Sequence, residues 1–157
     1  MSAVEIDEIL RLCIATLVGI AIGFNRELRG KPLGMRTLAL VALGAAIAST
    51  TAIHFGSLSE YPDALSRVVQ GVIQGVLTGI GFIGAGVVLH DRQTATVRGL
   101  TTAATVWIAA ALGISCALAD WVVVTTGVVL TLLVLFGLGW VESTLMSAHR
   151  DDQGDRS

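Results

Sequence analysis

The sequence predicts an all-α fold, a polytopic membrane helix bundle with about five transmembrane helices. Hydrophobic residues make up 54% of the 157 residues and charged residues only 14%, whereas soluble domains carry about 25% charge. The charges are clumped, and they leave uncharged stretches of about 20 residues, the length that crosses the hydrocarbon core of a bilayer. These stretches lack the alternation of a barrel strand, so helices are predicted.

The first predicted span covers residues 9–24, after an amphipathic lead-in from Val4. It is the weakest of the five because Arg11 lies in its outer turn, where a long side chain can snorkel to the interface. A secretory signal peptide would begin with positive charge. Here the start is acidic and the far end, GFNRELRGK, is basic, so we expect an uncleaved helix with its N-terminus outside.

Four further spans contain no Asp, Glu, Lys or Arg, and they cover residues 37–55, 68–89, 100–118 and 121–141. Asp120 is almost the whole loop between the last two, which should therefore form a tight helical hairpin. Residues 1–146 are then the transmembrane domain. The polar residues 147–157 are expected to be a disordered cytoplasmic tail.

The basic residues predict the orientation of the bundle. They gather in the loops at 25–36 and 90–99 and in the tail, which share one side of a five-span bundle, whereas the other side has only Arg11 and Arg67. Because the basic side faces the cytoplasm, an N-out, C-in topology is predicted. A net charge of −2 and the lack of a long basic cluster argue against nucleic acid as a partner.

The third span contains GIGFIGAG at residues 79–86, whose first six residues match a dinucleotide-binding turn. Such a turn needs a strand before it, a helix after it and an acidic residue about 20 positions on, and this context is missing. Glycines at 71, 75 and 79 recur every four residues instead, and small residues on one face let helices approach closely. The span is therefore expected to be the central helix, although GIGFIGAG could also unwind and line a cavity. The predicted packing residues are Gly71, Gly75, Gly79, Gly81, Gly84 and Gly86.

Polar residues gather where four spans meet the predicted cytoplasmic surface, and Arg26, Arg36 and Arg98 outnumber the carboxylates Glu27 and Asp91. In one interpretation they are positive-inside anchors and surface pairs, each worth little. In the other they form a partly buried Arg/Glu network that fixes helix ends or meets a partner. Helix N-termini with Thr and Arg also favour anions, so the second interpretation includes a phosphate or an acidic partner as ligand.

Several kinds of active protein are disfavoured by what the sequence lacks. No carboxylate lies within the five apolar stretches, whereas ion and proton pathways usually contain an intramembrane ionisable residue and magnesium prefers carboxylate oxygens. Neither a nucleophile–base pair nor Cys/His spacing for a metal is visible. A non-enzymatic chain with no cofactor and no metal site is therefore expected.

Three stretches together resemble the MgtC/SapB family of bacterial inner-membrane proteins: GIAIGFNRELRGKPLGMRTLALVALGAA, QGVLTGIGFIGAGVVL and VRGLTTAATVWIAAALGI. They cover most of residues 18–114 in the family's order. Members of the MgtC type also carry a soluble C-terminal domain, whose functions we do not transfer to this short form. The sequence departs from many members at Asn25, where they have an acidic residue. The motif positions that the resemblance implies are Arg26, Glu27, Gly34, Arg36, Thr37, Gln74, Gly79, Gly81, Gly84, Gly86, Arg98, Gly99, Leu100, Thr102 and Trp107.

The resemblance implies a multi-pass protein of the bacterial inner membrane that regulates other membrane machinery during growth in low magnesium and is linked to virulence in pathogens. Besides the lipid bilayer, the implied partners are another membrane complex, such as the ATP synthase or a magnesium transporter system, or a second copy of the chain. The alternative is a small oligomeric transporter or channel for Mg²⁺ or another solute. The residues expected to carry the function are Asn25, Arg26, Glu27, Arg36, Thr37, Gln74, Arg98 and Thr102.

Overall fold

A computed structural model describes residues 3–57, 62–91 and 96–138, and every long element in these ranges is a helix. The all-α prediction is confirmed. Residues 139–157, with the end of the predicted fifth span and the predicted tail, lie outside the described residues. The helices are α1 Ala3–Leu28, α2 Met35–Ser57, α3 Pro62–Val87, α4 Leu100–Ala117 and α5 Trp121–Leu133, followed by one π-helical turn, η1 Val134–Leu138.

Three of the helices are long and apolar enough to cross a membrane: Met35–His54, Asp63–Val87 and Leu100–Ala117. The helical stretch Trp121–Gly137 is equally apolar in character but shorter. The observed bounds agree closely with the predicted second and fourth spans, whereas α1 and α3 begin several residues earlier than predicted. The N-out, C-in orientation stays a prediction.

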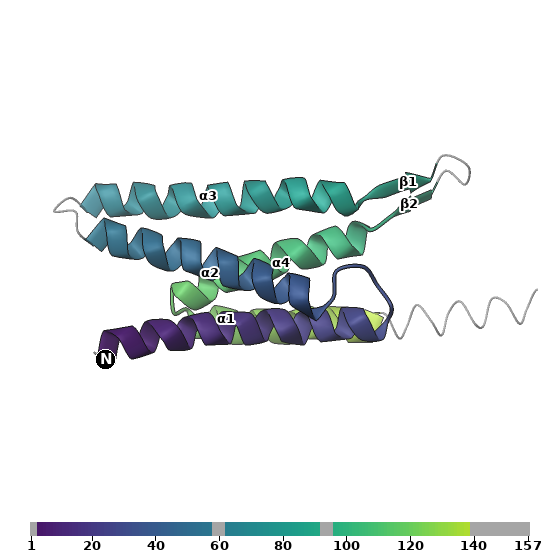
Figure 1. Ribbon diagram of the computed structural model, residues 1–157, viewed down its shortest axis with the longest axis horizontal. Helices are drawn as coiled ribbons and strands as arrows, with labels where there is room; N and C mark the ends of the chain where they lie inside the picture. Colours follow the sequence, from purple (N-terminus) through teal and green to yellow (C-terminus); the bar gives the residue numbers. More distant parts are fainter. Residues whose placement is uncertain (1–2, 58–61, 92–95, 139–157) are drawn as a thin grey trace, which may run out of the picture.

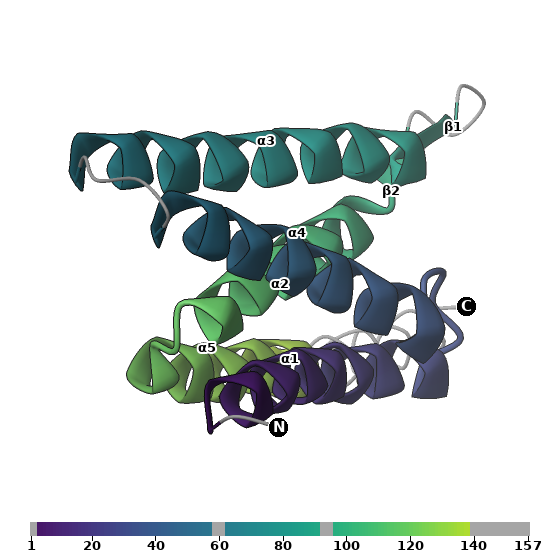
Figure 2. The same ribbon diagram turned by 60° about the vertical axis from the view of Figure 1, so that its left-hand side comes forward.

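The helices lie along one long axis in three layers (Figure 1). α3 forms one outer layer, α2 and α4 cross each other in the middle, and α1 and α5 lie together on the other side (Figure 2). The carboxyl ends of α1 and α3 and the amino ends of α2 and α4 share one end of the bundle. We call it the basic end, because its exposed residues include Arg29, Lys31, Arg36 and Arg98.

The central helix is α4, and the prediction that the third span is central is wrong. More than half of the apolar window of α4 is buried, 56%, against 6% for α3. Val106, Ala109 and Ala110 of α4 are fully buried and belong to clusters shared with α1 and α2. Alternating alanine and larger aliphatic side chains let α4 approach its neighbours closely and still fill the space between them.

Close helix contacts do use glycine, but at positions that the sequence analysis did not choose. A Cβ at Gly19 would overlap the carbonyl oxygen of Leu38, and a Cβ at Gly113 would overlap that of Ala42. Gly23 approaches the backbone of Met35 in the same way. These three glycines join α1 and α4 to α2. The four-residue spacing from Gly19 to Gly23 is the sequence feature that could have identified the first contact.

The glycines of α3 behave differently. A Cβ at Gly84 would lie 3.4 Å from the Cβ of Ala103, so this position packs as predicted. For the other five, nothing lies within 4 Å of an added Cβ, so they make no close contact with another helix among the described residues, and their role in packing stays a prediction. α3 is continuous through residues 79–86, so the GIGFIGAG pattern lies inside a helix and not at a strand–helix turn. The five are Gly71, Gly75, Gly79, Gly81 and Gly86.

Local sequence explains the helix ends. α1 ends with Gly30 at φ +60°, and the amides of Lys31 and Gly30 bond back to the carbonyls of Arg26 and Glu27, both at 3.0 Å, which is a Schellman motif. At the start of α5 the Asp120 carboxylate accepts a bond from the amide of Val123 at 3.2 Å. The predicted tight hairpin between the fourth and fifth helices is confirmed.

The predicted loop between the third and fourth spans contains a short antiparallel ribbon, β1 Leu89–Asp91 with β2 Thr96–Arg98. Leu89 pairs with Arg98, and the ribbon projects from the basic end (Figure 1). Gly99 follows at φ +92°, with its α-carbon so close to Val87 that a Cβ would overlap the Val87 carbonyl oxygen. Glycine is therefore required where the ribbon turns into α4.

Candidate functional site at the basic end

The basic end joins α1 to α4 through a buried polar contact. Arg26, in the last turn of α1, and Thr102, in the first turn of α4, are each only 4% exposed. The Nη2 of Arg26 donates a hydrogen bond to the Thr102 hydroxyl. The sequence analysis placed both residues in the site but could not pair them, because they lie 76 positions apart.

Two buried donors at this end of α1 have no acceptor among the described residues. Asn25 is 2% exposed, and neither its Nδ2 nor the Nε of Arg26 has a hydrogen-bond partner within residues 3–57, 62–91 and 96–138. Arg26 lies beyond the apolar stretch that ends at Phe24, and burial there lowers the pKa of its guanidinium. An arginine remains protonated in proteins even so. The contact is therefore rich in donors and in positive charge.

Glu27 does not pair with Arg26 in the structure; it caps the amino end of α2. Its Oε2 accepts a hydrogen bond from the amide of Met35, the first residue of α2, at 3.2 Å. A carboxylate at a helix N-terminus satisfies a free amide and complements the helix dipole. Gly34 leaves the necessary room, because a Cβ there would lie 2.8 Å from the same oxygen. The pairing explains why a glycine at position 34 accompanies a glutamate at position 27.

The other predicted residues are more scattered. Arg36 and Arg98 are exposed at the basic end, and neither forms an ion pair within residues 3–57, 62–91 and 96–138. Thr37 is half-buried in the first turn of α2. Gln74 is exposed in the middle of α3 and does not join the cluster. The structure thus joins Arg26 to Thr102, buries Asn25 beside Arg26 in the sequence, and separately pairs Glu27 with the start of α2.

The opposite end of the bundle holds two contacts that the sequence analysis missed. Arg11 donates from Nε to Asp7 at 2.7 Å and from Nη1 to the carbonyl of Ala117, the last residue of α4, also at 2.7 Å. The Nε2 of His54 lies 2.6 Å from an oxygen of Glu8. Asp7 precedes Arg11 by four positions, a spacing that favours pairing on a helix.

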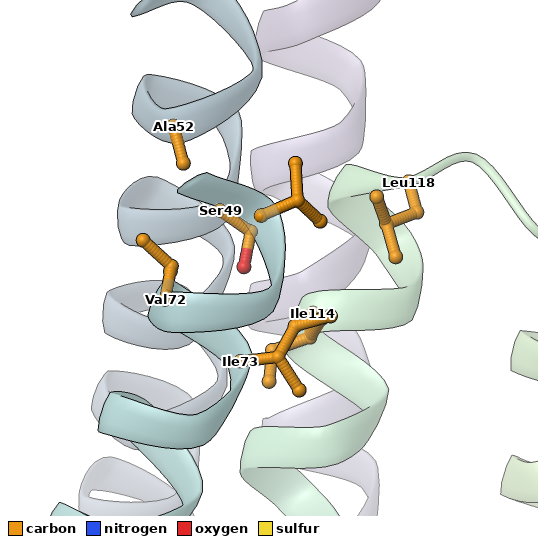
Figure 3. Close-up of a pocket in the computed structure, with 7 residues that line it drawn as sticks. Ser49, Ala52, Val72, Ile73, Ile114 and Leu118 are labelled. Carbon is orange, nitrogen blue, oxygen red and sulfur yellow. The ribbon is translucent and has the colours of Figure 1, made fainter. Parts of the chain in front are cut away.

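Near that end, side chains of α2, α3 and α4 line a narrow gap (Figure 3). Its lining is apolar apart from Ser49, whose hydroxyl bonds to the Ala45 carbonyl of its own helix. The gap is too narrow to admit a water molecule, so it is a packing defect and not a solute site. The described residues contain no group of three His, Cys, Asp or Glu side chains that could hold a metal ion.

Comparison with known proteins places these features in a family. The model of the MgtC family matches residues 12–144. The chain belongs to the MgtC family. It is 47% identical to protein SrpB of Synechococcus elongatus over 137 residues, which cover 81% of this chain and 72% of SrpB. No solved structure matches the chain.

Relatives in other bacteria are longer than the matched region. Protein MgtC of Salmonella typhimurium is 41% identical over 72% of this chain, and protein SapB of Bacillus subtilis is 36% identical over 71%. The matches cover 44% of MgtC and 48% of SapB. This chain therefore corresponds to less than half of these two relatives, and it shares with them a helical region of a membrane protein.

Proposed function

We propose that this member of the MgtC family is a non-enzymatic membrane protein that docks on another membrane protein through one face of α3. The observation that carries the proposal is the exposure of a glycine stripe on a helix that is long and apolar enough to cross the membrane. At helix contacts elsewhere in the chain, a neighbouring backbone fills the space beside the glycine, as it does at Gly113. Those of α3 offer the same close approach to a second protein.

The two sides of α3 differ in character. At about 100° per residue, Ile73, Val76, Leu77 and Ile80 fall on one side, and these residues pack on α2 and α4. The opposite side, which we call the free face, contains Gly71, Gly75, Gly79, Gly86 and Phe82. Phe82 is 83% exposed, the most exposed large apolar side chain of the described residues.

Polar residues on the edge of the free face support a protein partner over lipid. Gln74 and Thr78 are both exposed there, in the middle of a helix of 26 residues. An amide that faces hydrocarbon lacks hydrogen-bond partners and is unfavourable there. Side chains of Gln and Thr can instead bond across a contact between two membrane helices.

Regulation of other membrane machinery in low magnesium, with a link to virulence in pathogens, is the physiological part of the proposal. It rests on the resemblance to MgtC/SapB proteins of bacterial inner membranes. Growth of a deletion strain at limiting magnesium tests it. The wild-type gene should restore growth, and a Gly75→Leu variant that is still inserted and folded should not. Full rescue by that variant would show that growth in low magnesium does not depend on the free face of α3.

Docking is tested by photo-crosslinking in cells. A photoreactive phenylalanine analogue replaces Phe82 on the free face, and in a matched control it replaces Phe24, which is 49% exposed on α1. We expect the Phe82 position to yield a stoichiometric adduct with a different membrane protein, identified by mass spectrometry, and the Phe24 position to yield lipid adducts. Leucine at both Gly75 and Gly79 should remove the protein adduct.

Adducts of Phe82 with lipid alone, or only with a second copy of this chain, would refute docking on another protein. The alternative function, a small transporter or channel, has no specific support in the described residues, because the gap between α2, α3 and α4 is apolar and too narrow for water. It is tested separately by Mg²⁺ flux into liposomes that contain the purified chain.

A further inference from the structure

Arg26 is a buried cation with no carboxylate partner among the described residues. It is 4% exposed, and the one hydrogen-bond partner of its side chain in the described part of the chain is the neutral hydroxyl of Thr102. The carboxylate that follows it in sequence, Glu27, is exposed and bonded to the amide of Met35. A buried charge without an acceptor or a counter-ion is strongly unfavourable. An acceptor from outside the described residues would relieve this cost.

The field of α4 increases this need. Thr102 lies in the first turn of α4, where the free amides give the helix a partial positive charge. The Gly99 cap of this helix provides no side-chain hydrogen bond. Arg26 therefore contacts the end of the helix dipole that has its own sign, and the two together attract an anion.

Orphaned donors show where the anion would be held. The Nε of Arg26 and the Nδ2 of Asn25 are both buried, and neither has an acceptor in the part of the chain that the structure describes. A buried donor without an acceptor is unfavourable, and two residues that are adjacent in the sequence share this deficiency. Both atoms are donors, and a ligand that satisfies them must present oxygen acceptors, as water or an anion does. The uncompensated charge of Arg26 favours the anion.

Arg11, in contrast to Arg26, has acceptors for its guanidinium. It contacts the opposite end of α4, where the dipole is negative, and it is also paired with Asp7. Both of its partners are acceptors that carry negative or partial negative charge. Arg26 has neither kind of partner within the described residues.

We propose that Asn25, Arg26 and the first turn of α4 bind a phosphate group. A phosphate group presents several oxygens, and arginine, amide and helix N-terminal donors are the groups that bind them. Lipid headgroups carry phosphate at the end of a membrane span, and free phosphate is the other source of the same chemistry. The exposed Arg29, Lys31, Arg36 and Arg98 raise the local concentration of either one. The inference does not depend on the proposed docking function.

The test uses the full chain, purified and delipidated in a phosphate-free, uncharged detergent, with thermal unfolding followed by tryptophan fluorescence. One arm adds sodium phosphate, with chloride and acetate at matched ionic strength as controls. The other arm adds phosphatidylglycerol to the micelles, with diacylglycerol as its phosphate-free control. We expect a saturable rise of the unfolding midpoint in one arm at least, and the arm that responds identifies the source.

Asn25→Asp is the decisive variant, because it places a carboxylate beside Arg26 and supplies the missing acceptor. It should raise the midpoint without any ligand and weaken phosphate or lipid binding by about ten-fold or more. Arg26→Gln should weaken binding to a similar extent. Arg29→Gln removes an exposed cation three residues further on; it is the matched control and should weaken binding much less than Arg26→Gln, because it only lowers the general attraction of the basic end.

No response in either arm, or a response to acetate and not to phosphate, would overturn the proposal. So would an Asn25→Asp variant that binds as tightly as the wild type. Equal weakening of binding by Arg29→Gln and Arg26→Gln would show that the positive charge of the basic end attracts phosphate in general, and would refute a specific site. If Arg26→Gln does not fold, Asn25→Asp decides the question alone.

Discussion

α3 and α4 are almost equally apolar, yet they occupy opposite environments. Their windows have mean hydropathies of 1.6 and 1.7, but 6% of the α3 window is buried inside the chain and 56% of the α4 window. Gly113 of α4 lies against the backbone of Ala42, whereas Gly75 of α3 faces open space. Hydropathy reports only that a helix avoids water. Whether lipid, its own chain or another protein covers it depends on the shapes that meet it.

The largest expected effect separates the two glycines. Gly113→Leu forces side-chain atoms into the backbone of α2 and should destabilise the bundle by about 3 kcal/mol or prevent folding. Gly75→Leu enters open space and should change stability by no more than about 0.5 kcal/mol. The thermal unfolding midpoint in detergent measures both. A similar loss at both positions would show that α3 packs in the purified protein in a way that the structure does not contain.

A second comparison concerns the two glycines on either side of the ribbon. Gly99→Ala places a Cβ against the Val87 carbonyl at φ +92° and should cost on the order of 1–3 kcal/mol. Gly86→Ala, in α3 with nothing within 4 Å, should be neutral or slightly stabilising because alanine favours a helix. The unfolding midpoints of the two variants measure this difference in stability. A stable Gly99→Ala protein would mean that the junction before α4 rearranges easily.

Two arginines sharpen the comparison further, Arg11 of α1, which contacts α4, and Arg67 of α3. Arg11 ties α1 to the last turn of α4, and Arg11→Met should cost about 1–3 kcal/mol because the Ala117 carbonyl and Asp7 lose their donor. Arg67 bonds only to the Asp63 carbonyl of its own helix, and Arg67→Met should cost no more than about 0.5 kcal/mol. The difference in midpoint is the measurement. Equal shifts of the midpoint would mean that Arg67 holds α3 to another helix, a contact that the described residues do not show.

The smallest effect is expected where α4 ends. Ala119 has φ +57°, a left-handed conformation that is unfavourable for residues with a Cβ. Its amide bonds to the Cys116 carbonyl, and that of Asp120 to the Ser115 carbonyl, as in the glycine-ended α1. Ala119→Gly should therefore stabilise the protein by about 0.5–1 kcal/mol. Gly30→Ala is its mirror experiment and should destabilise. A destabilised Ala119→Gly protein would contradict the Schellman assignment.

Much of the fold follows from local properties of the sequence. The uncharged stretches predicted helices that the structure places at Met35–Ser57 and Leu100–Ala117 with nearly the same ends. Asp120 predicted the α4–α5 hairpin because a single polar residue leaves no room for a longer loop. Among the site residues, the places of Asn25, Arg26 and Thr102 at helix ends predict a common site; the structure joins Arg26 to Thr102 and buries all three.

The sequence by itself determined which segments are helices and that lipid can cover them, because hydropathy and helix capping depend on residues within a turn or two. Only the tertiary structure decided that α4 and not α3 is central, that Gly19, Gly23 and Gly113 make the close contacts, and that Arg26 meets Thr102. These outcomes depend on which faces meet across the bundle. A glycine has the same sequence signature whether a helix, a lipid or nothing stands opposite to it.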